Sequence, residues 1–338
     1  MTTYKEIFGK SVKSFDTGPS PATTLEGSIN YATEVEQFKS ATLTPGAWSA
    51  GNNLNTGRYF INASTAGTQN AMLGFAGYGP GASIHALTES YNGTSWSEVA
   101  DLPVAKSRSA GTGTQSAALC FGGFSPAGPN TTFNTTEEWG GSSWTGTGAM
   151  NQARCYMAGF GTQTASVAAA GARLNPDLLY NVTEEYDGST WTSGNAMPGF
   201  FVQQTGVGTL TAGIAMAGRK SPSSAYSGRS NTTATLEYDG TNWTAANSAP
   251  ASAEGAGGSG GGTQSAAWMG GWNDKSVQHY DGTNYSTVES TATKHASAGG
   301  GAVQSAGIIF GGVVDPPISN ATEEYTGATI TKRTLTTS

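Results

Sequence analysis

The chain has 338 residues, of which 49 are glycine and 12% are charged. Glycine is therefore about twice as frequent as its usual 7%, and charge about half as frequent as its usual 25%. A disordered chain is excluded, because disorder needs high net charge and few aromatic residues, and aromatic residues make up 10% here. The net charge of −7 argues against a nucleic-acid partner, and no apolar run reaches the roughly 18 residues of a membrane helix. We expect a turn-rich, all-β protein.

Residues 1–30 are the first predicted element, an extended N-terminal arm. The segment carries Lys5, Lys10 and Lys13 and continues with a stretch rich in Pro, Ser and Thr. It does not fit the repeat that follows, and a disordered tail is the alternative interpretation. Because the segment lacks the apolar core of a signal peptide, we expect synthesis in a cytoplasm. Cys120 and Cys155 lie in apolar stretches and are expected to be buried and reduced.

Residues 31–338 contain a repeat with a period of about 47 residues. One segment of the repeat is typified by GTQSAALCFGG, which begins at Gly113, and a second by TEEYDGSTW, which ends at Trp191. A period of roughly 40 to 50 residues is typical of a β-propeller blade. The predicted units are a closing half-unit at 31–57 and six units at 58–107, 108–153, 154–200, 201–253, 254–293 and 294–338.

Each unit predicts four short antiparallel strands. The first opens at an arginine (Arg58, Arg108 or Arg154), and the second is the apolar run, whose terminal glycines suit a close approach of backbones. The third is the TEEY stretch, followed by a pair such as Asp187-Gly188 that favours a two-residue type I′ turn. The fourth opens at a Trp expected to pack between neighbouring sheets. The predicted structural positions are Trp48, Trp96, Trp144, Trp191, Trp243, Gly122, Gly123, Gly270, Gly271, Gly311 and Gly312.

Paired acids such as Glu137-Glu138 and Glu184-Glu185 recur at one repeat position. Neighbouring residues of a strand point to opposite faces, so such a pair does not act together on one substrate. We interpret these acids as structural, with the arginines that open the first strands as their partners.

The second half of the repeat occurs once more at the N-terminus, around Phe38 and Trp48, whereas the last unit has Ile330 in place of its Trp. We expect the strand at Trp48 to complete or overlay the last blade and remove an exposed edge. Gly-Gly after an apolar strand, then an aromatic residue and a Trp, resembles the kelch repeat. The predicted fold is therefore an all-β, six-bladed, kelch-like β-propeller with four antiparallel strands per blade, closed with help from an N-terminal strand.

The connections between second and third strands are the variable loops of the repeat, and they lie on one face of such a propeller. Loops on a rigid scaffold are where binding usually resides. The candidate binding residues are Tyr78, His85, Phe124, Arg173, Asp177, Tyr180, Lys220, Tyr226, Arg229, Trp272 and Asp315.

An enzymatic function is not predicted. The three histidines include His279, in the place of a Glu of TEEY, and His295, near an arginine position, so both are interpreted as repeat variants. Three scattered histidines and two buried cysteines do not make a convincing zinc site or a His-based triad. We expect no catalytic residue, metal or cofactor.

The N-terminal MTTYKEIFGKSVK, the segment GSINYATEVEQFK and the reiterated GTQSAALCFGG and TEEYDGSTWT together resemble kelch-like propeller proteins of tailed phages, in particular marine or cyanobacterial ones. The resemblance implies a virion component of the tail or an appendage, present in several copies. Residues 1–30 would dock to other virion proteins, and the propeller would meet a host-surface glycan or protein. A cytosolic protein-binding kelch scaffold and a carbohydrate-active propeller are the alternatives.

Overall fold

The computed structural model describes residues 6–7, 10–11, 13–15, 29–32, 37–126, 131–250, 259–271, 274–313 and 318–335. Two compact units are present: unit 1 is Met1–Ala47 with Gly327–Ser338, and unit 2 is Trp48–Thr326. This division differs from the boundary expected at residue 30, because part of the expected closing segment pairs with the C-terminal strand. Among the described residues, no helix is long and apolar enough to cross a membrane.

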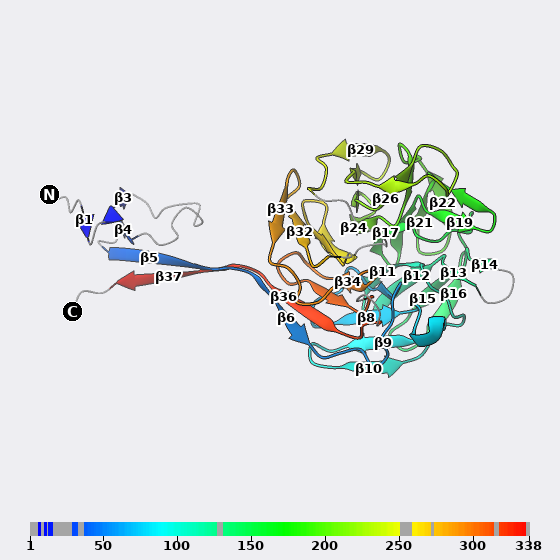
Figure 1. Cartoon of the computed structure of the whole chain (residues 1–338), viewed down its shortest axis with the longest axis horizontal. Helices are drawn as coiled ribbons and strands as arrows, with labels where there is room; N and C mark the ends of the chain where they lie inside the picture. The colour runs from blue at the N-terminus through cyan, green and yellow to red at the C-terminus, as the bar shows by residue number, and fades with distance from the viewer. Residues whose placement is uncertain are drawn as a thin grey trace. The chain divides into compact units, whose positions relative to one another are not determined.

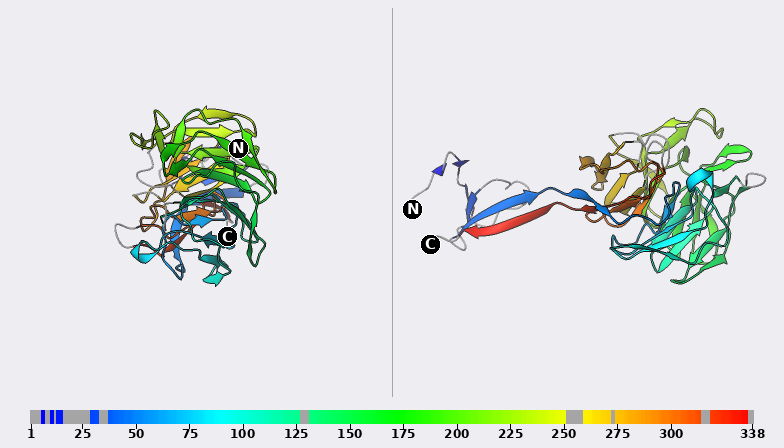
Figure 2. Two further views of the ribbon diagram at one scale, coloured as in Figure 1. Left: turned by 90° about the vertical axis from the view of Figure 1, so that its right-hand side faces the viewer. Right: turned by 60° about the horizontal axis from the view of Figure 1, so that its bottom comes forward.

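Unit 1 joins strands from the two ends of the chain. Its described strands are β1 (Glu6–Ile7), β2 (Lys10–Ser11), β3 (Lys13–Phe15), β4 (Ile29–Ala32), β5 (Gln37–Thr44) and β37 (Thr329–Leu335). β1 pairs with β2, and the other four form a sheet in the order β3-β4-β5-β37, with β3 and β4 parallel. β5 and β37 are antiparallel from Thr44 opposite Thr329 to Phe38 opposite Leu335, and they lie side by side in both views (Figure 1, Figure 2). Ile330 therefore belongs to unit 1.

The described part of unit 2 contains six four-stranded antiparallel sheets, each formed by strands that follow one another in the chain apart from the sixth (Figure 1). The first sheet consists of β7 (Asn62–Ala63), β8 (Met72–Phe75), β9 (Thr88–Tyr91) and β10 (Trp96–Val99). The second consists of β11 (Ala110–Thr114), β12 (Ala117–Phe121), β15 (Thr136–Trp139) and β16 (Trp144–Thr147). The third consists of β17 (Ala158–Thr162), β18 (Ala165–Ala169), β21 (Thr183–Tyr186) and β22 (Trp191–Gly194). The next two are β24 (Thr205–Thr209), β25 (Ala212–Met216), β28 (Thr235–Tyr238) and β29 (Trp243–Ala246); and β30 (Ser259–Thr263), β31 (Ala266–Gly270), β32 (Val277–Tyr280) and β33 (Tyr285–Val288). The sixth is β34 (Gly299–Gly301), β35 (Ile308–Phe310), β36 (Thr322–Thr326) and β6 (Ala47–Gly51). The prediction of an all-β chain with four-stranded antiparallel sheets is confirmed.

The sixth sheet takes its outer strand from the N-terminal side of unit 2. β6 lies beside β36, so the position that a Trp fills in the first four sheets and Tyr285 in the fifth is filled here by Trp48. Its indole packs 5.6 Å from that of Trp268 and 5.3 Å from the Tyr325 ring, measured between ring centroids. The first strands contact one another in the order β7, β11, β17, β24, β30, β34 and again β7.

In the first four sheets, the Trp residues that open the fourth strands connect each sheet to a neighbouring sheet. Their indole nitrogens donate to the hydroxyl of the Thr that opens the third strand there, each at 2.9 Å. The pairs are Trp144 with Thr88, Trp191 with Thr136, Trp243 with Thr183, and Trp96 with Thr322, the last of which joins the first sheet to the sixth. A satisfied N–H lets each ring be buried at low cost.

A glutamine in the turn between first and second strands adds a second connection. Gln163 donates through Nε2 to the carbonyl oxygens of Ala118 (3.0 Å) and Trp139 (2.7 Å) in the preceding sheet. The same bond pattern is formed by Gln69, Gln115, Gln264 and Gln304. Leu210 stands at this position in the fourth sheet.

The turns between third and fourth strands are longer than the predicted type I′ turns. Tyr186 pairs with Trp191, which leaves a four-residue loop in which Gly188 has a positive φ of 93° and Asp187 does not. The Asp187 carboxylate instead accepts hydrogen bonds from the backbone N–H groups of Ser189 and Thr190, each at 2.8 Å. These bonds lower the pKa of Asp187 to about 2, and they rather than backbone handedness explain why Asp or Asn opens the loop.

The loops between second and third strands form small sheets of their own. They are β13 (Phe124–Ser125) with β14 (Thr131–Thr132), β19 (Ala172–Leu174) with β20 (Asp177–Leu179), and β26 (Arg219–Ser221) with β27 (Ser230–Asn231) and β23 (Phe200–Val202). In the first sheet this loop holds the 3₁₀ turn η2 (Pro80–Ala82). Because strands alternate in direction, these loops share one side of unit 2 with the linkers that enter the first strands. We call this side the loop face.

Candidate functional site

Buried ion pairs fix the linkers that enter the first strands. Arg58 Nη2 lies 2.8 Å from Glu89 Oε1, Lys106 Nζ 2.7 Å from Glu137 Oε2, and Arg154 Nη2 2.8 Å from Glu184 Oε1. All three cationic side chains are fully buried. Burial lowers the pKa of Arg58 and of Arg154, and the paired carboxylate opposes this effect. The expected pairing of the recurring acids with the arginines that open the first strands is therefore present for Arg154 and Glu184, whereas Glu137 pairs with Lys106.

The second of these pairs corrects the repeat alignment. The repeat pattern predicts Arg108 as the equivalent of Arg58 and Arg154, but in the structure Lys106 occupies that position. Lys106 stands seven residues before Gly113, as Arg154 stands seven residues before Gly161. Arg108 therefore does not take part in this ion pair.

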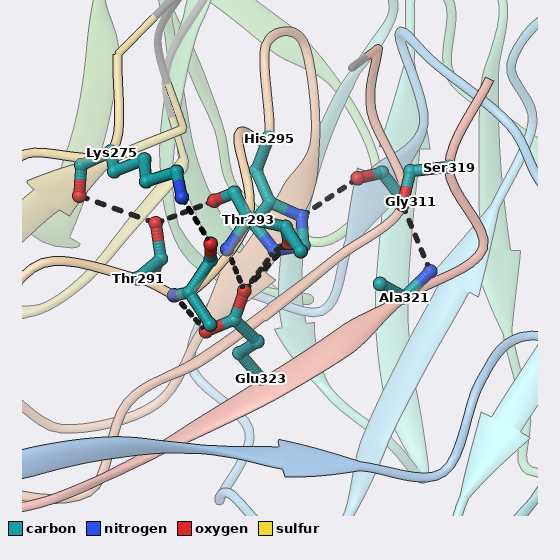
Figure 3. A network of polar contacts seen from close by, with 9 residues as sticks. Lys275, Thr291, Thr293, His295, Gly311, Ser319, Ala321 and Glu323 are labelled. Atoms are coloured by element: carbon teal, nitrogen blue, oxygen red, sulfur yellow. Dashed lines mark hydrogen bonds and ion pairs between the residues drawn. The ribbon is translucent and has the colours of Figure 1, made fainter. Parts of the chain in front are cut away.

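The sixth sheet has a histidine in the same position (Figure 3). His295 Nε2 lies 3.0 Å from Glu323 Oε1, and His295 Nδ1 lies 2.8 Å from the Gly311 carbonyl oxygen. Burial acts to raise the pKa of Glu323, but hydrogen bonds from His295, from the Thr293 hydroxyl and from two backbone N–H groups lower it to about 2. His295 is thus a structural variant of the cation position, consistent with its interpretation from the sequence.

The fourth sheet replaces both members of the pair with apolar residues. Phe201 and Leu236 occupy the positions of Arg154 and Glu184 and lie in one hydrophobic cluster. The backbone equivalence of Gln203 with Tyr156 assigns Phe201 to the cation position.

Two residues before the first strand, five sheets have a non-glycine residue in the left-handed region. These residues are Phe60 (φ 48°), Arg108 (φ 56°), Tyr156 (φ 59°), Gln203 (φ 61°) and Ser297 (φ 59°). Their backbones are linked: the N–H of Gln203 donates to the carbonyl of Tyr156, that of Tyr156 to Arg108, and that of Phe60 to Ser297. Left-handed conformations of bulky residues are strained and cluster at binding and catalytic sites. We call these five residues the left-handed set.

The left-handed set lines a cavity on the loop face. The cavity has a volume of about 90 Å³ and is lined by residues 60–62, 108–109, 156–157, 203–204 and 297–298. A second cavity of about 80 Å³ is lined mainly by the first strands. It shares with the first cavity the lining residues Ile61, Asn62, Ser109, Met157, Gln204 and Ala298. We call the first cavity the loop-face pocket. Because five sheets contribute the same backbone position, the scaffold repeats, and the chemistry of the pocket depends on the side chains at this position and next to it.

Arg108 is held among aromatic rings. Its guanidinium carbon lies 4.9 Å from the ring centroid of Phe60, 5.2 Å from Tyr78, 5.1 Å from Phe124 and 5.1 Å from Tyr156. Each such contact stabilises the cation by about 0.5–2 kcal/mol. Among the described residues the Arg108 guanidinium has no carboxylate partner and no hydrogen bond, and its Nε is buried. Aromatic faces thus hold the cation in place without neutralising it.

Gln204 is a second polar side chain of the pocket. It is 5% exposed, and neither its Oε1 nor its Nε2 forms a hydrogen bond with a described residue. A buried amide without a partner costs about 1–3 kcal/mol. The buried Gln204 amide and the buried Nε of the half-buried Arg108 lack partners among the described residues that surround one cavity, which indicates a place for a polar ligand.

Two candidate residues from the sequence support this pocket. Tyr78 is 5% and Phe124 6% exposed, and both buried rings contact the Arg108 guanidinium and help to position it. Tyr78 also stacks on Tyr59, with ring centroids 5.2 Å apart. His85 is half-buried, its Nε2 lacks a partner among the described residues, and burial lowers its pKa. His85 does not line the pocket.

Six further candidates lie on two loops that contact each other. The N–H of Leu179 donates to the carbonyl of Ser224 at 2.7 Å and joins the β19–β20 hairpin to the loop between β26 and β27. Arg173 and Asp177 are exposed and Tyr180 is half-buried on the hairpin. On the other loop, Lys220 lies over Phe201 at 5.3 Å, and Arg229 lies over its neighbour Tyr226 at 3.5 Å. Trp272 and Asp315 lie outside the described residues.

The pocket residues Phe60, Arg108, Tyr156, Gln203, Gln204 and Ser297 were not among the sequence candidates. A signal for five of them exists in the sequence: they share one repeat position, and that position changes from aromatic to cationic to amide between otherwise similar units. The incorrect alignment at Arg108 concealed it. Gln204 has no comparable signal.

The described residues give less support to a reactive cysteine or a metal site. Cys120 and Cys155 are free and buried, and burial raises the pKa of each thiol to about 12. Within the described ranges, no group of three or more His, Cys, Asp or Glu residues could hold a metal ion.

No protein-family model and no curated protein matches this sequence. Among solved structures, the fold is similar to that in "Structure of YjhT", with a TM-score of 0.66 over 83% of this chain and 99% of that chain. The sequence identity is 11%, so the likeness concerns the fold alone. The chain has a β-propeller-like all-β fold.

Proposed function

We propose that unit 2 is a closed, six-bladed, kelch-like β-propeller. The support is the repetition of one interface: Trp-to-Thr and Gln-to-carbonyl hydrogen bonds join successive sheets, and Trp96 and Gln69 form the same bonds from the first sheet to the sixth. β6 supplies the outer strand of the sixth sheet and so joins the N-terminal side of unit 2 to its C-terminal side.

We further propose that the protein is a non-enzymatic adhesion component of a phage particle. Unit 1 would dock to other virion proteins, and the loop face of unit 2 would bind the host surface. The phage assignment is supported by the resemblance of the N-terminal segment and the repeats. The observation that carries the binding role is the loop-face pocket, whose lining combines aromatic rings, amides and one unpaired cation, a composition suited to recognition.

The experiment compares the full chain with a variant that lacks residues 1–36. The deletion removes β1 to β4 and keeps β5 paired with β37. Both proteins are produced in cells in which the phage assembles without its own copy, and purified particles are examined by mass spectrometry. We expect the full chain in the particles, and a variant that has an unchanged melting temperature but is missing from them. Absence of the full chain from particles would refute the virion role and favour a cytosolic scaffold. Equal incorporation of the variant would refute docking through residues 1–36.

A further inference from the structure

The described lining of the loop-face pocket carries one positive charge. Among the described residues that line it, Arg108 is the only charged one, and none is Asp or Glu. Elsewhere in the described part of unit 2, the buried cations Arg58, Lys106 and Arg154 each have a carboxylate partner. Arg108 differs because its partners are four aromatic rings, which leave the hydrogen-bonding edge of the guanidinium without an acceptor.

From this arrangement we propose that the loop-face pocket binds the carboxylate of a sugar acid, either free or at the end of an acidic glycan. A carboxylate matches the planar fork of Arg108 through two parallel hydrogen bonds. One guanidinium neutralises one negative charge, so a carboxylate fits better than a phosphate monoester, whose second charge would be buried unpaired.

The remaining lining accounts for the sugar part of the ligand. Gln204 offers an amide donor and acceptor that lack partners, and Ser297 offers a hydroxyl. Phe60 and Tyr156 are half-buried and provide apolar ring surface beside these polar groups. A ligand with many hydroxyls would satisfy the amide while its carbon skeleton covers the rings. The second cavity, which has lining residues in common with the pocket, leaves further space.

The guanidinium is already ordered before a ligand arrives. Phe60 and Tyr156 flank it from the left-handed set, while Tyr78 and Phe124 hold it from the loops. Preorganisation reduces the conformational entropy that binding would otherwise cost. Arg229 on the loop face is a natural comparison, because it also lies on an aromatic ring but donates to the Tyr226 carbonyl and does not line the pocket.

This inference rests on the proposed binding role of the loop face, and its test uses the isolated full chain. Calorimetric titration compares glucuronate with glucose, which differs by the absence of the carboxylate, and with a polyglucuronate. We expect glucuronate to bind at least tenfold more tightly than glucose. R108Q should weaken glucuronate binding at least tenfold, Q204A should weaken it several-fold, and the matched control R229Q should leave it unchanged. R108K keeps the charge but not the planar fork and should recover only part of the affinity.

Thermal melting of each variant accompanies the titrations, and if R108Q fails to fold, the titrations of Q204A and R108K decide between the outcomes. Equal binding of glucuronate and glucose, binding of neither sugar nor the polymer, or polymer binding that R108Q and R108K leave unchanged would overturn the proposal. Polymer binding that these variants weaken supports it with a glycan end as the source. If glucuronate binds but purified particles lack the protein, the pocket assignment stands and the virion role fails. If particles contain the protein but it binds no sugar acid, the virion role stands and the pocket assignment fails.

Discussion

The buried pair of Arg154 and Glu184 makes a quantitative prediction, because the fourth sheet shows the same position without charges. Glu184 accepts hydrogen bonds from Arg154 at 2.8 Å and from the backbone N–H of Asn151 at 2.6 Å. E184L removes both acceptors and leaves a fully buried guanidinium without its counter-ion. Such a loss costs about 3–5 kcal/mol of the free energy of unfolding.

The double variant R154F/E184L reproduces the pair Phe201 and Leu236 of the fourth sheet. It removes the buried charge together with its partner, and the added apolar side chains contribute about 1.5–3 kcal/mol each if fully buried. Arg154 also donates to the carbonyl of Ala170, which then loses a hydrogen bond at a cost of about 1–3 kcal/mol. We therefore expect the double variant to be more stable than E184L and the coupling between the two sites to be at least about 2 kcal/mol.

The assay is a double-mutant cycle by urea unfolding, followed by tryptophan fluorescence and far-ultraviolet circular dichroism. Coincidence of the two signals establishes a single transition for each variant. The reciprocal control is L236E, which introduces a carboxylate beside Phe201 and should destabilise more than the double change at 154 and 184. Additivity of R154F and E184L within about 0.5 kcal/mol would refute the reasoning, because independent sites add to that extent.

Three further predictions concern the turns, a buried histidine and the interfaces between sheets. G113A should lower the free energy of unfolding by about 2 kcal/mol or more, because Gly113 has a φ of 83° and a Cβ there would lie 2.2 Å from a backbone carbonyl oxygen of the facing strand. The control G146A lies at an exposed strand position with open space and should change the free energy of unfolding by less than about 0.5 kcal/mol in the same urea assay. Burial lowers the pKa of His279 from 6.5 to about 4, so the unfolded chain binds the proton more readily and the free energy of unfolding falls as the pH decreases through this interval. H279Q should remove about 1–2 kcal/mol of that decrease, and an unchanged dependence of stability on pH would contradict the assignment. Q163A should cost about 1–3 kcal/mol in melting experiments, because it leaves two carbonyls of the preceding sheet without their donor, and a cost below that of G146A would count against the interface bond.

The sequence predicted the sheets well because their causes are local and repeated. An apolar run such as 117–121 and a Trp such as Trp144 recur at matching places, and each recurrence reports the same packing between sheets. The third-to-fourth turns were predicted at the right places with the wrong type, because Asp-Gly is compatible with several turns. The Asp side chain chooses among them by binding backbone N–H groups, as Asp187 does.

The pocket could not be predicted with the same success, because Lys106 and Arg108 are both positively charged and lie only two residues apart. Both are cations at alternate positions of one linker, and only the reach to Glu137 and the left-handed backbone at 108 separate their roles. Likewise, the pairing of β5 with β37 joins residues nearly 300 positions apart, and no local pattern encodes it.

The sequence by itself thus determined the repeat, the strands and the residues between the sheets, because each is set by contacts that recur with a fixed period. Only the tertiary structure decided which cation has a counter-ion and which, Arg108, lies among aromatic rings without one. The physical reason is that charge pairing depends on distances of a few ångströms between segments far apart in the chain, and such distances exist only once the sheets are packed.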